Sequence, residues 1–200
     1  MKILVTGFDP FGGESINPSW EAVKALPDTI ENMEIIKLLL PTEFVNSEKL
    51  LLAAMAEQAP DAVICCGQAA GRKAVSFERL AINLRDASIA DNAGYKPTDE
   101  AVKAGEREAY FVTLPVKAMA EAVKSAGIAS ELSLSAGAFV CNNVLYALLR
   151  ETFGTEIIGG FVHLPLSPQQ AEGKNPPLPF MEIGDMTRAL EEAIRVLAKA

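Results

Sequence analysis

The sequence is poor in the residues that build metal sites and nucleic-acid interfaces. It has one histidine and three cysteines in 200 residues, and no spaced cysteine pairs, which is too little for a zinc site of the usual kinds. It has no basic run, and its 18 Lys and Arg residues are outnumbered by 26 Asp and Glu residues, which gives a net charge of −8. Proteins that bind nucleic-acid phosphates instead gather Lys and Arg on one face. We therefore expect no metal site and no nucleic-acid partner.

Long hydrophobic runs are also lacking. The longest candidates, Ile35–Leu40 with Lys37 inside it and Ala62–Cys66, have the length of strands and fall far below the ~20 residues that span a bilayer. The N-terminal MKILVTG is interrupted by Gly7 too early for a signal peptide. These features predict a soluble, cytoplasmic protein without a membrane partner.

The cysteines do not form a disulfide framework in this interpretation. Their number is odd, and Cys65 and Cys66 are adjacent within an apolar run. Neighbouring thiols in a strand are typical of buried, unreactive cysteines. This leaves Cys141 as the cysteine with a different sequence context.

What the chain does contain is a globular α/β pattern. Half of its residues are hydrophobic and 22% are charged, which is far from the composition of disordered chains and fits one domain over residues 1–200. Short aliphatic runs alternate with segments of helical periodicity, which is typical of an open, largely parallel α/β sheet with helices on both faces. The expected strands are Lys2–Thr6, Glu34–Leu40, Asp61–Cys66, Glu131–Ser135 and Glu156–Leu164. The expected helices are Pro18–Leu26 with Asn17 as N-cap, Thr42–Gln58, Pro115–Gly127, a helix following Cys141, and Asp185–Ala198.

One segment interrupts this alternation. Residues Leu84–Tyr110 are polar, include DNAGYKPTDE, and are too long for an ordinary connection. Because it has few apolar anchors, we expect it to be mobile or to lie in a subunit contact.

The turn GFDPFGG, residues 7 to 13, follows the first expected strand. It lacks the G-x-G-x-x-G pattern and the Lys and Ser/Thr of a phosphate-binding loop. It places Phe8 and Phe11 at the carboxyl end of a strand, where α/β proteins bind ligands. These rings either pack the turn onto the core or form the wall of a flat apolar pocket.

Two further residues have the chemistry of a nucleophile and a base. Cys141 follows an expected strand and precedes an expected helix, and amides at a helix N-terminus lower the pKa of a thiol. His163 lies 22 residues later, at the end of the next expected strand. If these strands are adjacent and parallel, both side chains reach one edge of the sheet, as a Cys-His pair requires. A buried inert cysteine and a structural histidine are the alternatives.

Glu78, in GRKAVSFERLAIN, is the candidate for a third group. By itself it is an ordinary surface carboxylate or a partner for Arg79. With Cys141 and His163 it supplies an acid that orients the imidazole.

Together the motifs resemble pyrrolidone-carboxylate peptidase (pyroglutamyl peptidase I), a family of cysteine peptidases. The resemblance extends over nearly the whole chain and rests on collinear segments rather than on one motif. The segments are VTGFDPFGG, CCGQAAGR, SFERLAIN, DNAGYKPTD, YFVTLPVKAM, SAGAFVCNN and GGFVHLPLSPQQ.

The resemblance implies a single three-layer α/β/α sandwich with a mostly parallel, mixed sheet. It implies a cytoplasmic enzyme, commonly a homotetramer, that removes N-terminal pyroglutamate from peptides with a Cys-His-Glu triad and no metal or organic cofactor. Carried over by position, Cys141 is the nucleophile, His163 the base and Glu78 the orienting acid. Phe8 and Phe11 bind the ring, and Gln68 lies beside the lactam.

The chain departs from the family pattern at one place. Where the family has an Arg and, two positions later, a Pro, this sequence has Ser88 and Ala90, and Arg85 is a candidate substitute for the missing Arg. This departure motivates one alternative, a catalytically weakened homologue. A second alternative is a small-molecule or anion-binding α/β protein that uses the GFDPFGG turn.

Overall fold

The computed structural model describes residues 1–172 and 174–199. Its centre is a seven-stranded sheet in the order β2-β3-β1-β4-β9-β5-β8. The pairs β3-β1, β1-β4, β4-β9 and β5-β8 are parallel, whereas β2-β3 and β9-β5 are antiparallel, so the sheet is mixed but mostly parallel. The strands of this sheet are β1 (Lys2–Phe8), β2 (Thr29–Ile30), β3 (Met33–Leu40), β4 (Ala62–Gln68), β5 (Val75–Glu78), β8 (Ser130–Ser133) and β9 (Ile158–Leu164).

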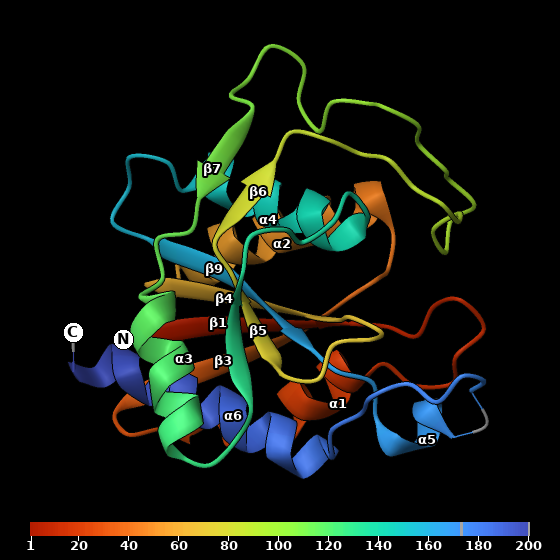
Figure 1. The fold of residues 1–200 in the computed structure, drawn as a ribbon. Coiled ribbons are helices and arrows are strands. Elements are labelled where there is room, and N and C mark those ends of the chain that lie inside the picture. Colours follow the sequence, from red (N-terminus) through yellow and green to blue (C-terminus); the bar gives the residue numbers. More distant parts are fainter. Residues whose placement is uncertain (173, 200) are drawn as a thin grey trace.

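Helices cover both faces of the sheet, giving the expected three layers (Figure 1). One face carries α1 (Pro18–Lys24), α3 (Val116–Ser125) and α6 (Ile183–Arg195), and the other carries α2 (Phe44–Gln58) and α4 (Val140–Glu151). A two-stranded sheet of β6 (Leu80–Ile82) and β7 (Ala109–Phe111) lies beside α4. The short α5 (Pro168–Ala171) follows β9, and a 3₁₀ turn, η1 (Val196–Lys199), follows α6.

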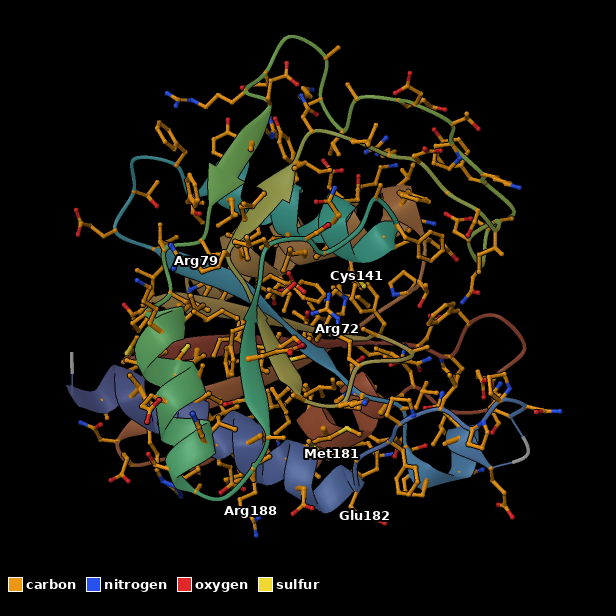
Figure 2. All side chains as sticks on the ribbon, in the orientation of Figure 1. Arg72, Arg79, Cys141, Met181, Glu182 and Arg188 are labelled. Atoms are coloured by element: carbon orange, nitrogen blue, oxygen red, sulfur yellow. The ribbon has the colours of Figure 1, made fainter. Side chains whose placement is uncertain are left out.

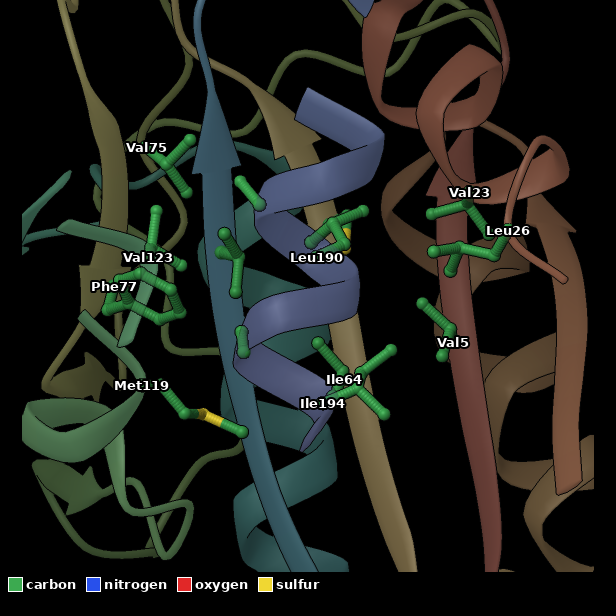
Figure 3. Close-up of a cluster of buried hydrophobic side chains, with 14 of the residues drawn as sticks. Val5, Val23, Leu26, Ile64, Val75, Phe77, Met119, Val123, Leu190 and Ile194 are labelled. Carbon is green, nitrogen blue, oxygen red and sulfur yellow. The ribbon is translucent and has the colours of Figure 1, made fainter. Parts of the chain in front are cut away.

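The two hydrophobic layers follow the alternation of side chains along the strands. In Figure 3, Leu190 and Ile194 of α6 face Val5 and Ile64 on the central strands. Residues of opposite parity on the same strands pack against α2 and α4 instead. Because successive side chains of a strand point to opposite faces, each strand contributes to both layers.

Helix ends follow the local chemistry predicted from the sequence. The side chain of Asn17 accepts a hydrogen bond from the Ser19 amide (3.1 Å) and caps α1, with Pro18 in the first turn. Gly127 follows α3 with φ of +81°, the left-handed conformation that glycine adopts without a steric penalty. The expected strands and helices are all present, with ends shifted by a few residues.

One expectation about topology is wrong. The strands expected around residues 131–135 and 156–164 are β8 and β9, but β5 lies between them and runs antiparallel to β9. Sequence patterning missed β5 because it is only four residues long. The site is therefore assembled from β4, β5, β9 and α4 rather than from two adjacent parallel strands.

The polar segment after β6 has more anchors than its composition suggests. Asp91 is 7% exposed, and its carboxylate accepts hydrogen bonds from the amides of Phe44 (2.9 Å) and Tyr95 (2.8 Å). Arg85 and Glu100 form a bridge between the two arms of the segment. Its mobility and any subunit contact remain predictions.

In residues 1–172 and 174–199, no helix is long and apolar enough to cross a membrane.

Candidate active site

A cavity of about 340 Å³ lies at the carboxyl ends of β1, β4 and β9, within the range of small-ligand sites. In Figure 1 this edge of the sheet is where the arrow of β9 ends. Five of the six residues proposed from the sequence line the cavity: Phe8, Phe11, Gln68, Cys141 and His163. The sixth, Glu78, is fully buried behind His163.

Cys141 lies in the first turn of α4, as expected, and Figure 2 labels it there. Its Sγ lies against Gly67 of β4, where an added Cβ would come within 2.8 Å of the sulfur. Gly67 is the register partner of His163 on β9. Because Gly67 has no side chain, the Cys141 sulfur fits against β4. This places the sulfur next to β9, the strand that carries His163.

His163 and Glu78 are joined across the antiparallel pair of β9 and β5. His163 is in register with Ser76, so Glu78, two residues further along β5, points to the same face and meets the imidazole diagonally. His163 Nδ1 lies 2.7 Å from Glu78 Oε1. Because the ionised carboxylate only accepts, the contact places the proton on Nδ1 and leaves the lone pair on Nε2.

Arg72 is part of this site and was missed by the sequence interpretation. Its Nη2 lies 2.9 Å from Glu78 Oε1 and donates to the carbonyl of Ser135 at 3.1 Å. Figure 2 shows Arg72 in the loop that connects β4 to β5. The sequence offered one indication of Arg72, its place in the segment CCGQAAGR. An Arg in a Gly-rich loop has no spacing that distinguishes a site residue from a surface residue.

The surroundings of Glu78 keep it ionised. Burial acts to raise its pKa, but the hydrogen bond and charge of His163, the Ser133 hydroxyl and the charge of Arg72 outweigh it, so the pKa lies below the usual value. An ionised Glu78 holds the imidazole in one tautomer and stabilises its protonated form.

The expected low pKa of Cys141 is wrong for this structure. Burial, followed by the negative charge of Glu78, raises the pKa of the thiol to about 12, against the smaller opposing effects of Arg72 and a backbone amide. Burial also lowers the pKa of His163, although Glu78 acts in the opposite direction. The resting site therefore holds a neutral thiol and a neutral imidazole, and the sulfur becomes nucleophilic when a base removes its proton.

The charge state predicts how Cys141 reacts with alkylating reagents. Only the thiolate reacts, so the rate of modification by iodoacetamide should rise with pH throughout the range 6 to 10. Peptide mapping during the reaction measures the rate at each cysteine. Cys65 and Cys66 are fully buried, whereas Cys141 lines the cavity, so the reagent should not reach Cys65 and Cys66 and both should remain unmodified. A Cys141 rate that is independent of pH between 6 and 8 would contradict the neutral pair.

Three phenylalanine rings surround the cavity. Phe8 is 2% exposed and its ring centroid lies 6.4 Å from that of Phe161, so it both packs the turn and lines the cavity. Phe11 lies 6.1 Å from Phe139, which in turn meets Phe44 edge to face. Phe139, two residues before Cys141, also lines the cavity and was missed. A hydrophobic residue before a nucleophile is too common to be a signal.

Asn17 and Thr42 line the cavity as well, although the sequence identified them only as helix-start residues. Their polar groups meet on the GFDPFGG turn: Asn17 Nδ2 and Thr42 Oγ1 donate to the carbonyl of Asp9 at 2.9 and 3.0 Å. Asp9 Oδ1 accepts from the Thr42 amide at 2.6 Å. Because the turn carries this negatively charged carboxylate, it is a poor binding site for an anion.

Arg85 does not take the place of the missing Arg. Its side chain points to α2 and α4, with Nε donating to Asn143 Oδ1 at 2.6 Å and Nη2 lying 3.3 Å from Glu48 Oε2. Ser88 is exposed, and neither residue lines the cavity. Arg72, by contrast, does line the cavity.

A cysteine and a histidine that line a cavity at the edge of a three-layer sheet, with a buried carboxylate bonded to the histidine, define a cysteine-type peptidase of the α/β class. The family model described as pyroglutamyl peptidase matches residues 1–200, and the chain belongs to the pyroglutamyl peptidase family.

The similar proteins match this chain over nearly its whole length. The pyrrolidone-carboxylate peptidase of Thermoanaerobacter sp. (strain X514) is 47% identical to this chain, and the match covers 100% of this chain and 98% of that protein. The pyrrolidone-carboxylate peptidase of Thermococcus kodakarensis is also 47% identical, and the match covers 98% of this chain and 96% of that protein. The crystal structure of pyroglutamyl peptidase I from Bacillus amyloliquefaciens superposes with a TM-score of 0.92 at 43% identity, covering 96% of this chain and 94% of that one. The structure of a mutant pyrrolidone carboxyl peptidase from Pyrococcus furiosus superposes with a TM-score of 0.95 at 38% identity, covering 100% of this chain and 99% of that one.

Proposed function

We propose that the protein hydrolyses the bond after an N-terminal pyroglutamyl residue by acyl transfer to Cys141. The observation that supports this most directly is that Cys141 and His163, the latter bonded to Glu78, line the same cavity as Phe8 and Phe11. The ring would lie between the aromatic walls, with the carbonyl carbon of the scissile bond, which is attached to the ring, at the sulfur.

In the first step, His163 Nε2 takes the thiol proton as the sulfur attacks the carbonyl carbon. The oxygen that becomes negative would be stabilised by backbone amides in the first turn of α4, which has no side-chain cap. The imidazolium then protonates the leaving amine, giving a thioester on Cys141. In the second step His163 removes a proton from water, the hydroxide attacks the thioester, and the sulfur regains its proton as the acid leaves.

Glu78 would contribute through the imidazole and not through the substrate. It holds Nδ1 protonated, so that Nε2 is the basic nitrogen in both steps. Arg72, which contacts the same carboxylate oxygen, would keep that carboxylate fixed and ionised.

The cavity also accounts for selection of pyroglutamate over other N-termini. The lactam nitrogen is neutral, whereas an ordinary N-terminus carries an ammonium group. Burying an unpaired ammonium among Phe8, Phe11 and Phe139 would cost several kcal/mol. We therefore expect rejection of glutaminyl peptides on the ground of desolvation as well as shape.

The experiment that tests the function compares three fluorogenic amides: pyroglutamyl, glutaminyl and prolyl. The wild-type protein should release the fluorophore only from the pyroglutamyl amide, and Cys141→Ala should release none. A wild-type protein without turnover would support the catalytically weakened homologue. Equal cleavage of the glutaminyl amide would contradict the neutral-ring account.

Removing one aromatic wall should weaken substrate binding without changing the chemistry. Phe11→Ala is expected to raise KM for the pyroglutamyl amide up to about tenfold, which corresponds to the roughly 0.5–1.5 kcal/mol of aromatic packing. The alkylation rate of Cys141 should stay near that of the wild type. Phe111→Ala, at an exposed ring on β7, is the matched control and should leave KM unchanged. An unaltered KM in Phe11→Ala would exclude the ring from the binding site.

The family resemblance also motivates a homotetramer in the cytoplasm. Sedimentation analysis of the purified protein measures the assembly directly, and a monomer at micromolar concentration would contradict it.

A further inference from the structure

Gln170 is a buried polar residue outside the triad that contacts the cavity only through another side chain. It lies in α5, directly after β9, and is 3% exposed. Its Nε2 lies 2.9 Å from Gln68 Oε1, and Gln68 lines the cavity at the end of β4.

The orientation of the Gln170 side-chain amide follows from two neighbouring backbone groups, one that can only donate a hydrogen bond and one that can only accept. The backbone N–H of Ser167 can only donate, and it lies 3.2 Å from Gln170 Oε1. The carbonyl of Ile16 can only accept, and it lies 3.2 Å from Gln170 Nε2. Gln170 therefore presents its oxygen to Ser167 and its NH₂ group to Ile16 and Gln68.

This orientation determines which end of Gln68 faces the cavity. Because Gln170 donates to it, the acceptor of the contact is Gln68 Oε1, and the NH₂ group of Gln68 is the free end. Within the part of the chain that the structure describes, Gln68 Nε2 donates to no other residue. A ligand in the cavity therefore meets two N–H donors at this position.

We propose that Gln170 is a specificity-determining residue that acts by positioning: it holds Gln68 with its N–H groups toward the cavity, so that the site selects a ligand presenting a neutral carbonyl oxygen and disfavours an ammonium. This inference rests on the proposed function, since the lactam of a pyroglutamyl group presents such an oxygen. It adds to that function the residue that decides the direction of the hydrogen bond.

Gln170→Glu tests the proposal with little change of shape. The new carboxylate still accepts from the Ser167 amide but donates to nothing, so Gln68 must turn its NH₂ group away from the cavity to meet it. The oxygen of Gln68 then faces the ligand carbonyl. Gln169→Glu is the matched control, because it adds the same charge one residue away on an exposed side chain.

The measured quantity is binding of the five-membered lactam 2-pyrrolidone, read as protection of Cys141 from iodoacetamide. The concentration for half-protection should rise about tenfold in Gln170→Glu, the loss expected for one reversed hydrogen bond, and remain unchanged in Gln169→Glu. KM for the pyroglutamyl amide should rise by a similar factor, with kcat affected much less.

The same substitution in a Gln68→Ala background separates positioning from structural damage. With no amide to orient, Gln170→Glu should change half-protection by less than about twofold. An equal loss in both backgrounds would overturn the proposal, as would unchanged half-protection in the single variant or no protection of the wild type. If Gln170→Glu does not fold, Gln170→Met, which also lacks the donor, is judged by the same double-variant criterion.

Failure of the proposed function has a different signature. Protection by the lactam that depends on Gln170, in a wild-type protein without amide turnover, would support the positioning role and reject the peptidase activity. Turnover with lactam binding that is insensitive to Gln170 would do the reverse.

Discussion

Replacing His163 by alanine is expected to lower kcat for the pyroglutamyl amide by about 10⁴-fold, the upper end of the range for a general acid–base group. The effect is large because the Cys141 thiol is neutral at rest, with its pKa raised to about 12. Without a base on β9, the sulfur keeps its proton, and the leaving amine has no proton donor. Steady-state kinetics with the purified variant measures the loss.

Two controls distinguish this outcome from damage to the fold. The variant should still fold cooperatively but unfold at a lower temperature than the wild type, because alanine leaves a cavity at a buried position and removes one hydrogen-bond partner of Glu78. Added imidazole should restore part of the activity, since the cavity adjoins the vacated space. A His163→Ala enzyme within tenfold of the wild-type kcat would remove His163 from the mechanism.

Glu78→Gln is expected to give a smaller loss than His163→Ala, about 10²-fold in kcat, at the lower end of the same range. The amide oxygen of Gln can still accept from His163 Nδ1, so the tautomer is partly preserved. The charge is lost, however, and with it the stabilisation of the imidazolium that forms when the sulfur attacks. Arg72 also loses its charged partner, at 2.9 Å in the wild type.

The pH profile reports on this role specifically. The negative charge of Glu78 acts to raise the pKa of His163, and only the neutral imidazole is a base. The acid limb of kcat/KM should already lie below pH 6.5 in the wild type, because burial lowers the pKa of His163, and should move to still lower pH in Glu78→Gln. Glu131→Gln, which changes an exposed carboxylate bonded to Ser76 on the neighbouring strand, should leave the profile unchanged. A Glu78→Gln enzyme with unchanged kcat and acid limb would remove Glu78 from the site.

Much of the fold could be predicted because the strands and helices carry strong local signals. The first five residues of β4, Ala62 to Cys66, are all apolar. Asn17 and Pro18 mark the start of α1, since Asn is a good N-cap and Pro fits the first helical position. The order of the strands could not be predicted in the same way. The insertion of β5 between β8 and β9 depends on long-range pairing of a four-residue strand, for which the sequence has no local signal.

The site shows the same division between local chemistry and long-range geometry. Cys141, His163 and Glu78 were identified by residue type and by the family resemblance. Cys141 and His163 line the cavity, and Glu78 lies 2.7 Å from His163. Arg72, Phe139 and Gln170 were missed because their contacts are with residues distant in the sequence, as for Gln170 and Gln68, which are 102 positions apart. The raised pKa of Cys141 was missed for a related reason: the helix N-terminus is visible in the sequence, whereas the burial that outweighs it depends on the packing of the sulfur against β4.

The central claim, that Cys141 carries the acyl group, is tested most directly by trapping that group. The protein is mixed with excess pyroglutamyl amide, quenched in acid within the first turnover, digested, and mapped by mass spectrometry. The account predicts a pyroglutamyl thioester on the peptide containing Cys141 and none on the peptide containing Cys65 and Cys66, with the adduct disappearing as substrate is consumed. An adduct on Cys65 or Cys66, or undiminished hydrolysis by Cys141→Ala, would contradict it.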